Sequence, residues 1–148
     1  MKTIRYLIAL LALAGAVVST LALRAHYSTA TEPCSINDRW DCGIVNHSPF
    51  AVIAHVPVAA LGIAGYLALG ALALFGQRFA AFLAALVGLG FALRLTFIEE
   101  FALGVWCLYC VISQAMIALM AVLSLIWLTE EYIALKRAHN APRAHMKG

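Results

Sequence analysis

The four cysteines are the residues of this chain best suited to chemistry, and they form two pairs. Cys107 and Cys110 make a C-x-x-C sequence, while seven residues separate Cys34 from Cys42. All four lie at or near the ends of apolar segments. Structural cysteines are usually buried among apolar residues, so we would expect some of them in mid-segment. The placement therefore indicates redox or metal chemistry.

The two pairs are expected to differ in their surroundings. Cys107 and Cys110 lie where a predicted helix begins, and free N–H groups at a helix N-terminus stabilise a thiolate. Cys110 is predicted to lie about 4.5 Å deeper along the helix axis than Cys107. Cys34 and Cys42 lie in a polar loop, where an exposed disulfide suits exchange with a soluble thiol. A static disulfide clamp is the alternative for that loop pair.

A zinc site is the alternative chemistry for the four cysteines, with His47 and His55 as further ligands. The seven-residue spacing of Cys34 and Cys42 is unusual for zinc-binding cysteines. The C-x-x-C sequence also lies at a predicted membrane helix. The prediction is therefore a redox site without a metal.

The composition places these cysteines in a membrane protein. Of the 148 residues, 64% are hydrophobic and 11% are charged, whereas soluble domains are about 45–50% apolar. A soluble domain of this length could not bury so much apolar surface. The sequence shows no basic face with interleaved aromatic residues, which excludes nucleic acid as a partner.

The apolar segments predict an all-α integral membrane protein, a bundle of four transmembrane helices in a single domain spanning 1–148. About 20 helical residues cross a bilayer, and four segments reach that length: residues 4–23, 50–75, 79–98 and 105–128. We read the first as a span rather than a signal peptide, because its apolar part is long and no A-x-A site follows. An outer loop (24–49) carries one cysteine pair. A tail (129–148) follows, with disorder expected from Asn140 to Gly148.

The basic residues predict the orientation. Seven Lys or Arg residues lie in the N-terminus, the short loop at Arg78 and the tail, so these parts belong inside. The loop 24–49 and the C-x-x-C sequence then lie together on the outer face. The predicted location is the bacterial inner (cytoplasmic) membrane, with the active site on the periplasmic or outer side.

The motifs taken together resemble the vitamin K epoxide reductase family, and in particular its bacterial disulfide-generating members. The resemblance covers roughly residues 5–130 and rests on motifs that are specific only in combination. These are Pro33-Cys34, Cys42 with Ser48 six residues later, the stretch from His55 to Tyr66 with Pro57 and Gly62, and Trp106-Cys-Leu-Tyr-Cys-Val-Ile-Ser113. The DsbB family does similar work, but its C-x-x-C comes before its loop pair.

The resemblance implies a membrane thiol–quinone oxidoreductase that supports disulfide formation. Cys34 would exchange with a periplasmic or extracellular thioredoxin-fold (DsbA-like) partner, and Cys42 would then attack Cys107. Cys110 would be released as a thiolate and reduce a quinone, either ubiquinone or menaquinone. Because the chain is short, we expect the thioredoxin-fold partner to be a separate protein.

Three further residues are candidates for binding the quinone. Ser48 matches a loop serine that lies near the quinone in the family, although it could equally cap a turn. His55 could donate a hydrogen bond to the quinone or relay a proton. Gln114 and Val58 align with the Tyr and Asn that hold vitamin K in the animal enzymes, and this difference argues against vitamin K epoxide as a substrate. The remaining alternative is a metal-binding or structural membrane protein with four cysteines.

Overall fold

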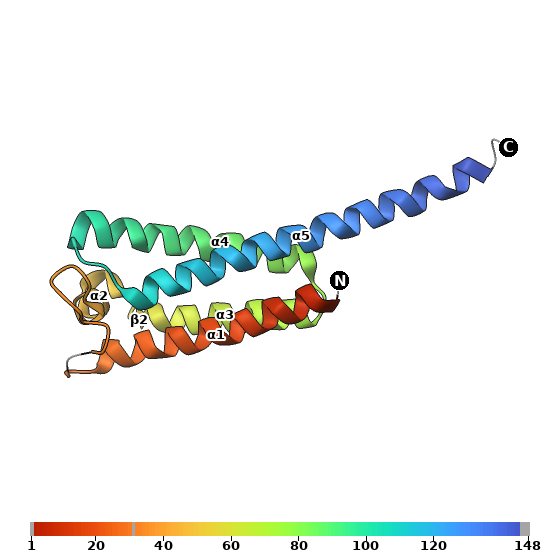
Figure 1. Cartoon of the computed structure of the whole chain (residues 1–148). Helices are drawn as coiled ribbons and strands as arrows, with labels where there is room; N and C mark the ends of the chain where they lie inside the picture. The colour runs from red at the N-terminus through yellow and green to blue at the C-terminus, as the bar shows by residue number, and fades with distance from the viewer. Residues whose placement is uncertain (1, 31, 146–148) are drawn as a thin grey trace.

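The chain folds into a bundle of four long helices that lie side by side (Figure 1). The computed structural model describes residues 2–30 and 32–145, with side chains up to residue 140. The long helices are α1 (Lys2–Tyr27), α3 (Val58–Leu74), α4 (Arg78–Ile98) and α5 (Leu108–His145). α1 and α4 each contact both α3 and α5, so the four helices close a ring.

Within the described residues, three helical segments are long and apolar enough to cross a membrane, which agrees with the predicted all-α membrane fold. They comprise Lys2–Tyr27, Arg78–Leu103 and Leu108–Asn140. The second segment is α4 together with a π-helical turn, η2 (Glu99–Leu103), that follows it directly. α3 is also apolar but has 17 residues.

Small residues allow α1 and α3 to pack closely. Without a hydrophobic driving force between helices in lipid, close backbone approach through Gly, Ala and Ser stabilises their association. The close contacts pair Gly15 with Tyr66, Gly62 with Ser19, and Gly70 with Ala12. The main apolar core, which includes Ile8, Leu69 and Met120, lies between these helices and α5.

The loop between α1 and α3, which carries Cys34 and Cys42, lies at the end of the bundle opposite the N-terminus (Figure 1). It contains the short helix α2 (Cys42–His47), a 3₁₀ turn η1 (Pro49–Ala51), and two short strands, β1 (Val52–Ile53) and β2 (Val56–Pro57). The strands pair antiparallel, with Val52 opposite Pro57 and Ile53 opposite Val56.

Two predicted boundaries differ from the structure. The second apolar segment was expected to be helical from residue 50, but α3 begins only at Val58. Pro57 has no N–H and disfavours helical backbone at Val56, so the chain forms a hairpin before the helix. At the other end, the predicted polar tail continues α5 to His145. Residues 129–140 contain neither Gly nor Pro, and the last three residues of the predicted disordered end lie outside the described part.

Candidate active site

A backbone bridge holds the loop beside the start of α5. The Asp41 N–H donates to the Trp106 carbonyl at 3.0 Å, and the Trp106 N–H donates to the Arg39 carbonyl at 2.8 Å. This is a parallel pairing of Trp40 with Trp106. Cys42 follows directly after Asp41, and Cys107 follows directly after Trp106. The bridge therefore brings one cysteine of each pair to the same place.

Cys34 and Cys42 form a disulfide with their Cα atoms 5.7 Å apart. Cys42 is the first residue of α2, and Asp41 is the N-cap, whose carboxylate accepts the Ile44 N–H at 3.1 Å. The Ser35 hydroxyl donates to the same carboxylate at 2.8 Å. This hydrogen bond lowers the pKa of Asp41 from its ordinary value, against the opposing effect of burial. Asp41 thus holds in place both the segment next to Cys34 and the start of α2 at Cys42.

The loop disulfide is buried, and the expectation of an exposed pair was wrong in this respect. Cys34 is 2% exposed, and Cys42 is completely buried, as is Cys107. These three cysteines and Val45 form one buried cluster, with Cys110 packed against it. Polarity alone suggested an exposed loop, but the loop folds back onto the start of α5. The burial favours exchange between the two pairs within the protein.

Cys107 occupies the N-cap of α5. Its carbonyl accepts the Val111 N–H at 3.0 Å, and its sulfur accepts the Cys110 N–H at 3.3 Å. Ser, Thr, Asp and Asn usually fill this role. The Asn46 side-chain amide also donates to the Cys107 sulfur, at 3.7 Å, and to the Cys42 carbonyl at 2.8 Å. The donors thus converge on the Cys107 sulfur, whereas the sequence had suggested that the helix N-terminus favours a Cys110 thiolate.

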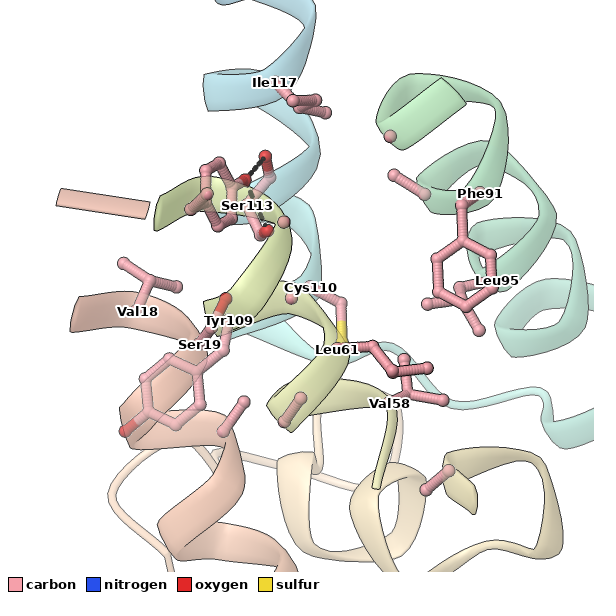
Figure 2. Close-up of a pocket in the computed structure, with 18 of the residues that line it drawn as sticks. Val18, Ser19, Val58, Leu61, Phe91, Leu95, Tyr109, Cys110, Ser113 and Ile117 are labelled. Carbon is pink, nitrogen blue, oxygen red and sulfur yellow. Dashed lines mark hydrogen bonds between the residues drawn. The ribbon is translucent and has the colours of Figure 1, made fainter. Parts of the chain in front are cut away.

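Cys110 borders a mostly apolar cavity of about 540 Å³ between the helices. Figure 2 shows its sulfur pointing into the space that Leu61 of α3 and Phe91 and Leu95 of α4 also border. Cys107 and Cys110 are both free thiols. The second pair therefore connects the buried loop disulfide on one side to an apolar cavity on the other.

This arrangement of cysteines fits a family known from sequence. A sequence model described as the vitamin K epoxide reductase family matches residues 6–125, most of the chain. The chain belongs to the vitamin K epoxide reductase family. A search of curated proteins found no match.

Family membership fixes the class of activity. Vitamin K epoxide reductase family members are membrane thiol–disulfide oxidoreductases, so this chain is an oxidoreductase of the membrane. The family generally uses quinones and thioredoxin-like redox partners. A zinc site made by all four cysteines does not fit the structure, because Cys34 and Cys42 are bonded to each other and cannot act as free thiolate ligands.

The three candidate quinone-binding residues have different settings in this vitamin K epoxide reductase homologue. Ser48 borders the cavity, and its hydroxyl donates to the Val45 carbonyl at 2.7 Å. His55 is exposed in the turn between β1 and β2 and does not border the cavity. Gln114 accepts a hydrogen bond from Thr96 and also lies outside the cavity lining. Quinone binding by these residues stays a prediction.

Sequence reasoning missed two residues of the site. Asn46 lies one helical turn after Cys42, and this spacing in a short loop was a signal that its side chain could reach the site. Glu99 lies between two apolar segments, and nothing in the sequence distinguishes it from the adjacent Glu100. In the structure it is 2% exposed, and its carboxylate accepts the Cys107 N–H at 3.0 Å.

Proposed function

We propose that this protein oxidises a soluble thioredoxin-fold (DsbA-like) protein and passes the electrons to a membrane quinone, thereby supporting disulfide formation. One observation carries the proposal. The Cys107–Cys110 pair lies between the buried Cys34–Cys42 disulfide and the apolar cavity. A two-electron path from a soluble dithiol to a lipid-soluble acceptor requires this order of groups.

The exchange begins with the Cys107–Cys110 pair oxidised. A partner thiolate attacks Cys34, which forms a mixed disulfide and frees Cys42 as a thiolate. Cys42 attacks Cys107 and releases Cys110. The second partner thiol then displaces Cys34, and Cys34 attacks Cys42 to free Cys107. The net result is an oxidised partner and a reduced Cys107–Cys110 pair, with the loop disulfide restored.

The last state of the proposed exchange has the same cysteine pairing as the structure. The loop pair is a disulfide, and Cys107 and Cys110 are thiols. In the proposed scheme this state holds the two electrons next to the cavity. The Asn46 amide and the Cys110 N–H stabilise negative charge on the Cys107 sulfur as it is released.

The cavity suits a quinone ring. Small-molecule sites are typically about 300–1,000 Å³ and mostly apolar, and this cavity of about 540 Å³ falls in that range. Phe91, Leu95 and Leu61 would contact the ring, and Ser48 offers a polar edge. A bound ubiquinone or menaquinone accepts two electrons and two protons. The residues that border the cavity therefore fit the proposed acceptor.

We also propose that α3 is the fourth span and that the loop faces the periplasm or exterior across the bacterial inner membrane. With 17 residues, α3 extends about 26 Å, close to the thickness of a bilayer core. α1 begins with Lys2, has Arg5 in its first turn and starts at the end of the bundle opposite the loop; α4 begins there with Arg78, and this is the inner end by the positive-inside rule.

A trapping experiment tests the partner. Cys42→Ser leaves Cys34 without its internal partner, so a mixed disulfide with the incoming protein should accumulate in cells. We expect mass spectrometry to identify a thioredoxin-fold protein linked to Cys34, and Cys34→Ser as the matched control to capture nothing. Normal insertion of Cys42→Ser with no captured dithiol protein would contradict the proposed partner.

A turnover assay tests the acceptor. Purified protein with a reduced thioredoxin-fold dithiol protein should reduce a short-chain quinone, measured by ultraviolet absorbance. Cys110→Ala should abolish this reduction, because the sulfur that borders the cavity is gone. Unchanged turnover in Cys110→Ala would refute the proposed electron path.

A further inference from the structure

Glu99 is a buried carboxyl group placed between the thiols and the cavity. It is 2% exposed and borders the cavity. A carboxylate oxygen lies within 4.8 Å of the sulfur atoms of both Cys107 and Cys110. One oxygen, Oε2, accepts the Cys107 N–H at 3.0 Å. The other, Oε1, is buried and has no hydrogen-bond partner within the described side chains.

The backbone gives two consecutive glutamates opposite settings. η2 begins at Glu99, and π-helical turns of this kind are frequent at functional sites. The segment ends at Gly104 with φ +64°, a conformation that glycine adopts without strain. Glu100 faces outward, where it accepts the Trp106 indole N–H at 2.8 Å and lies 3.7 Å from Arg39. Glu99 alone is directed into the site.

We infer that Glu99 carries a proton from the Cys110 thiol to the quinone in the cavity, an inference that rests on the proposed function. Among the described side chains, none hydrogen-bonds to Oε1, and burial of the carboxyl group at 2% exposure limits its proton exchange with bulk water. The Cys110 sulfur and the cavity are both next to this carboxyl group. Burying a polar atom without a hydrogen-bond partner destabilises the folded protein. A role in proton transfer explains why the Glu99 carboxyl is nevertheless buried here.

The step balances as follows. The Glu99 carboxylate takes the proton of the Cys110 thiol, which leaves a Cys110 thiolate. A bond forms between the Cys107 and Cys110 sulfurs as two electrons leave them for the quinone. The two thiol protons end on the quinone oxygens, the one from Cys110 by way of Glu99. Glu99 returns to a carboxylate and is ready for the next cycle.

If Glu99 had only a structural role, its substitutions would have different effects. An acceptor for the Cys107 N–H is all that such a role needs, and the amide oxygen of a glutamine supplies one. Proton transfer instead needs an ionisable carboxyl. A structural role therefore predicts that Glu99→Gln works as well as Glu99→Asp or better, whereas a proton carrier predicts that only Glu99→Asp keeps activity.

The first experiment needs no quinone. Reduced, quinone-free protein is alkylated with iodoacetamide over a range of pH, and the modification of Cys110 is followed by mass spectrometry. When Glu99 and Cys110 share one proton, a fixed fraction of the pair carries the thiolate, so the alkylation rate has a plateau in pH. In Glu99→Gln the rate should instead rise about tenfold per pH unit, as for an isolated thiol.

Glu100→Gln is the matched control and should keep the plateau, because Glu100 faces outward. Other ionisable groups on the surrounding elements could also shape the profile. They are Cys107 and Tyr109 on α5, Tyr66 on α3, Arg94 on α4, His26 on α1 and His47 on α2. All of them are unchanged between the two variants, so only the loss of the Glu99 carboxyl can remove the plateau. A plateau that persists in Glu99→Gln overturns the inference.

The second experiment follows electron transfer from the reduced protein to a short-chain quinone in a stopped-flow instrument. General acid–base catalysis typically contributes about 100-fold or more, so we expect a loss of that size in Glu99→Gln and a smaller loss in Glu99→Asp. Exchange between the partner and Cys34 should be unchanged. A wild-type rate in Glu99→Gln refutes the inference.

The two experiments separate this inference from the proposed function. If the wild-type protein does not reduce quinone at all, the proposed function fails, while the plateau still reports whether Glu99 takes the Cys110 proton. Formation of the Cys34–Cys42 disulfide checks the folding of each variant. Should Glu99→Gln not fold, Glu99→Asp decides instead, because its shorter carboxyl should lower the plateau, and an unchanged plateau contradicts the proposal.

Discussion

Gly15 on α1 is the position where a single added methyl group has the most predictable consequence. A Cβ atom there would lie 2.4 Å from Cε1 of Tyr66 and 2.6 Å from Cδ1 and Cζ. Carbon atoms pack best at about 3.5–4.0 Å, so the overlap is roughly 1 Å. Tyr66 cannot easily turn away, because it is 5% exposed and its hydroxyl donates to the Ser113 carbonyl at 2.8 Å.

Gly15→Ala must therefore separate α1 from α3 or displace the Tyr66 ring. Overpacking of this kind costs about 1–3 kcal/mol, and loss of the hydrogen bond to Ser113 adds about 1 kcal/mol. We expect the free energy of unfolding to fall by about 2–4 kcal/mol. Tyr66 also borders the cavity, so the quinone-linked step should slow as well.

Unfolding of the detergent-solubilised protein, followed by circular dichroism, measures this effect. Gly90→Ala on α4 is the matched control, because a Cβ there has no atom of the described residues within 4 Å. Tyr66→Ala supplies a second test, since Gly15→Ala should cost little once the ring is gone. The steric reasoning is refuted if Gly15→Ala is as stable as Gly90→Ala.

Three further predictions concern the loop and the start of α5. Because the Ser35 hydrogen bond lowers the pKa of Asp41, loop stability should be lost as the pH falls below about 4; a phosphine should therefore reduce the loop disulfide more slowly in the wild-type protein than in Asp41→Asn at about pH 5, the two rates should converge at about pH 3, and a difference that persists at pH 3 would contradict this. Asn46→Leu removes the amide that joins α2 to the Cys107 sulfur and should slow exchange between the pairs by up to about 100-fold, measured by acid quench and alkylation. Gly104→Ala should destabilise the protein to unfolding by about 1 kcal/mol, since alanine is strained at φ +64°.

Hydropathy predicted the helical segments well, because length and apolar composition decide which segments can cross a bilayer. It could not predict the hairpin at residues 52–57. Val52, Ile53 and Val56 are as apolar as the helix that follows, and the turn between them places Ala54 and His55 at positive φ without a glycine to signal it. Hydropathy averages over such local turns.

The sequence grouped the cysteines into two motifs, but it could not predict which of them are bonded in the resting state or how they are enclosed. Burial of Cys34 depends on the loop folding back onto Val105 and Leu103, contacts between residues about 70 positions apart in the sequence. Glu99 shows the same limit. Two adjacent glutamates look alike in sequence, and the helical turn that contains them directs the first inward and the second outward.

The buried loop disulfide places a condition on the proposed exchange, because a partner thiolate must reach the Cys34 sulfur. The loop has to open, and its hydrogen bonds indicate which side moves. Around Cys34 they stay within the loop itself: the Ser35 N–H donates to the Glu32 carbonyl at 3.0 Å, the Ile36 N–H donates to the Trp40 carbonyl at 2.9 Å, and the Ser35 hydroxyl donates to the Asp41 carboxylate at 2.8 Å.

Cys42 is held from outside the loop. It begins α2, it follows the backbone bridge to Trp106, and Asn46 ties its carbonyl to the Cys107 sulfur. Opening therefore exposes Cys34 while Cys42 stays beside Cys107. This asymmetry supports Cys34 as the partner-facing cysteine and Cys42 as the one that attacks Cys107. It follows from how the segments around the two cysteines are anchored, since both cysteines are buried.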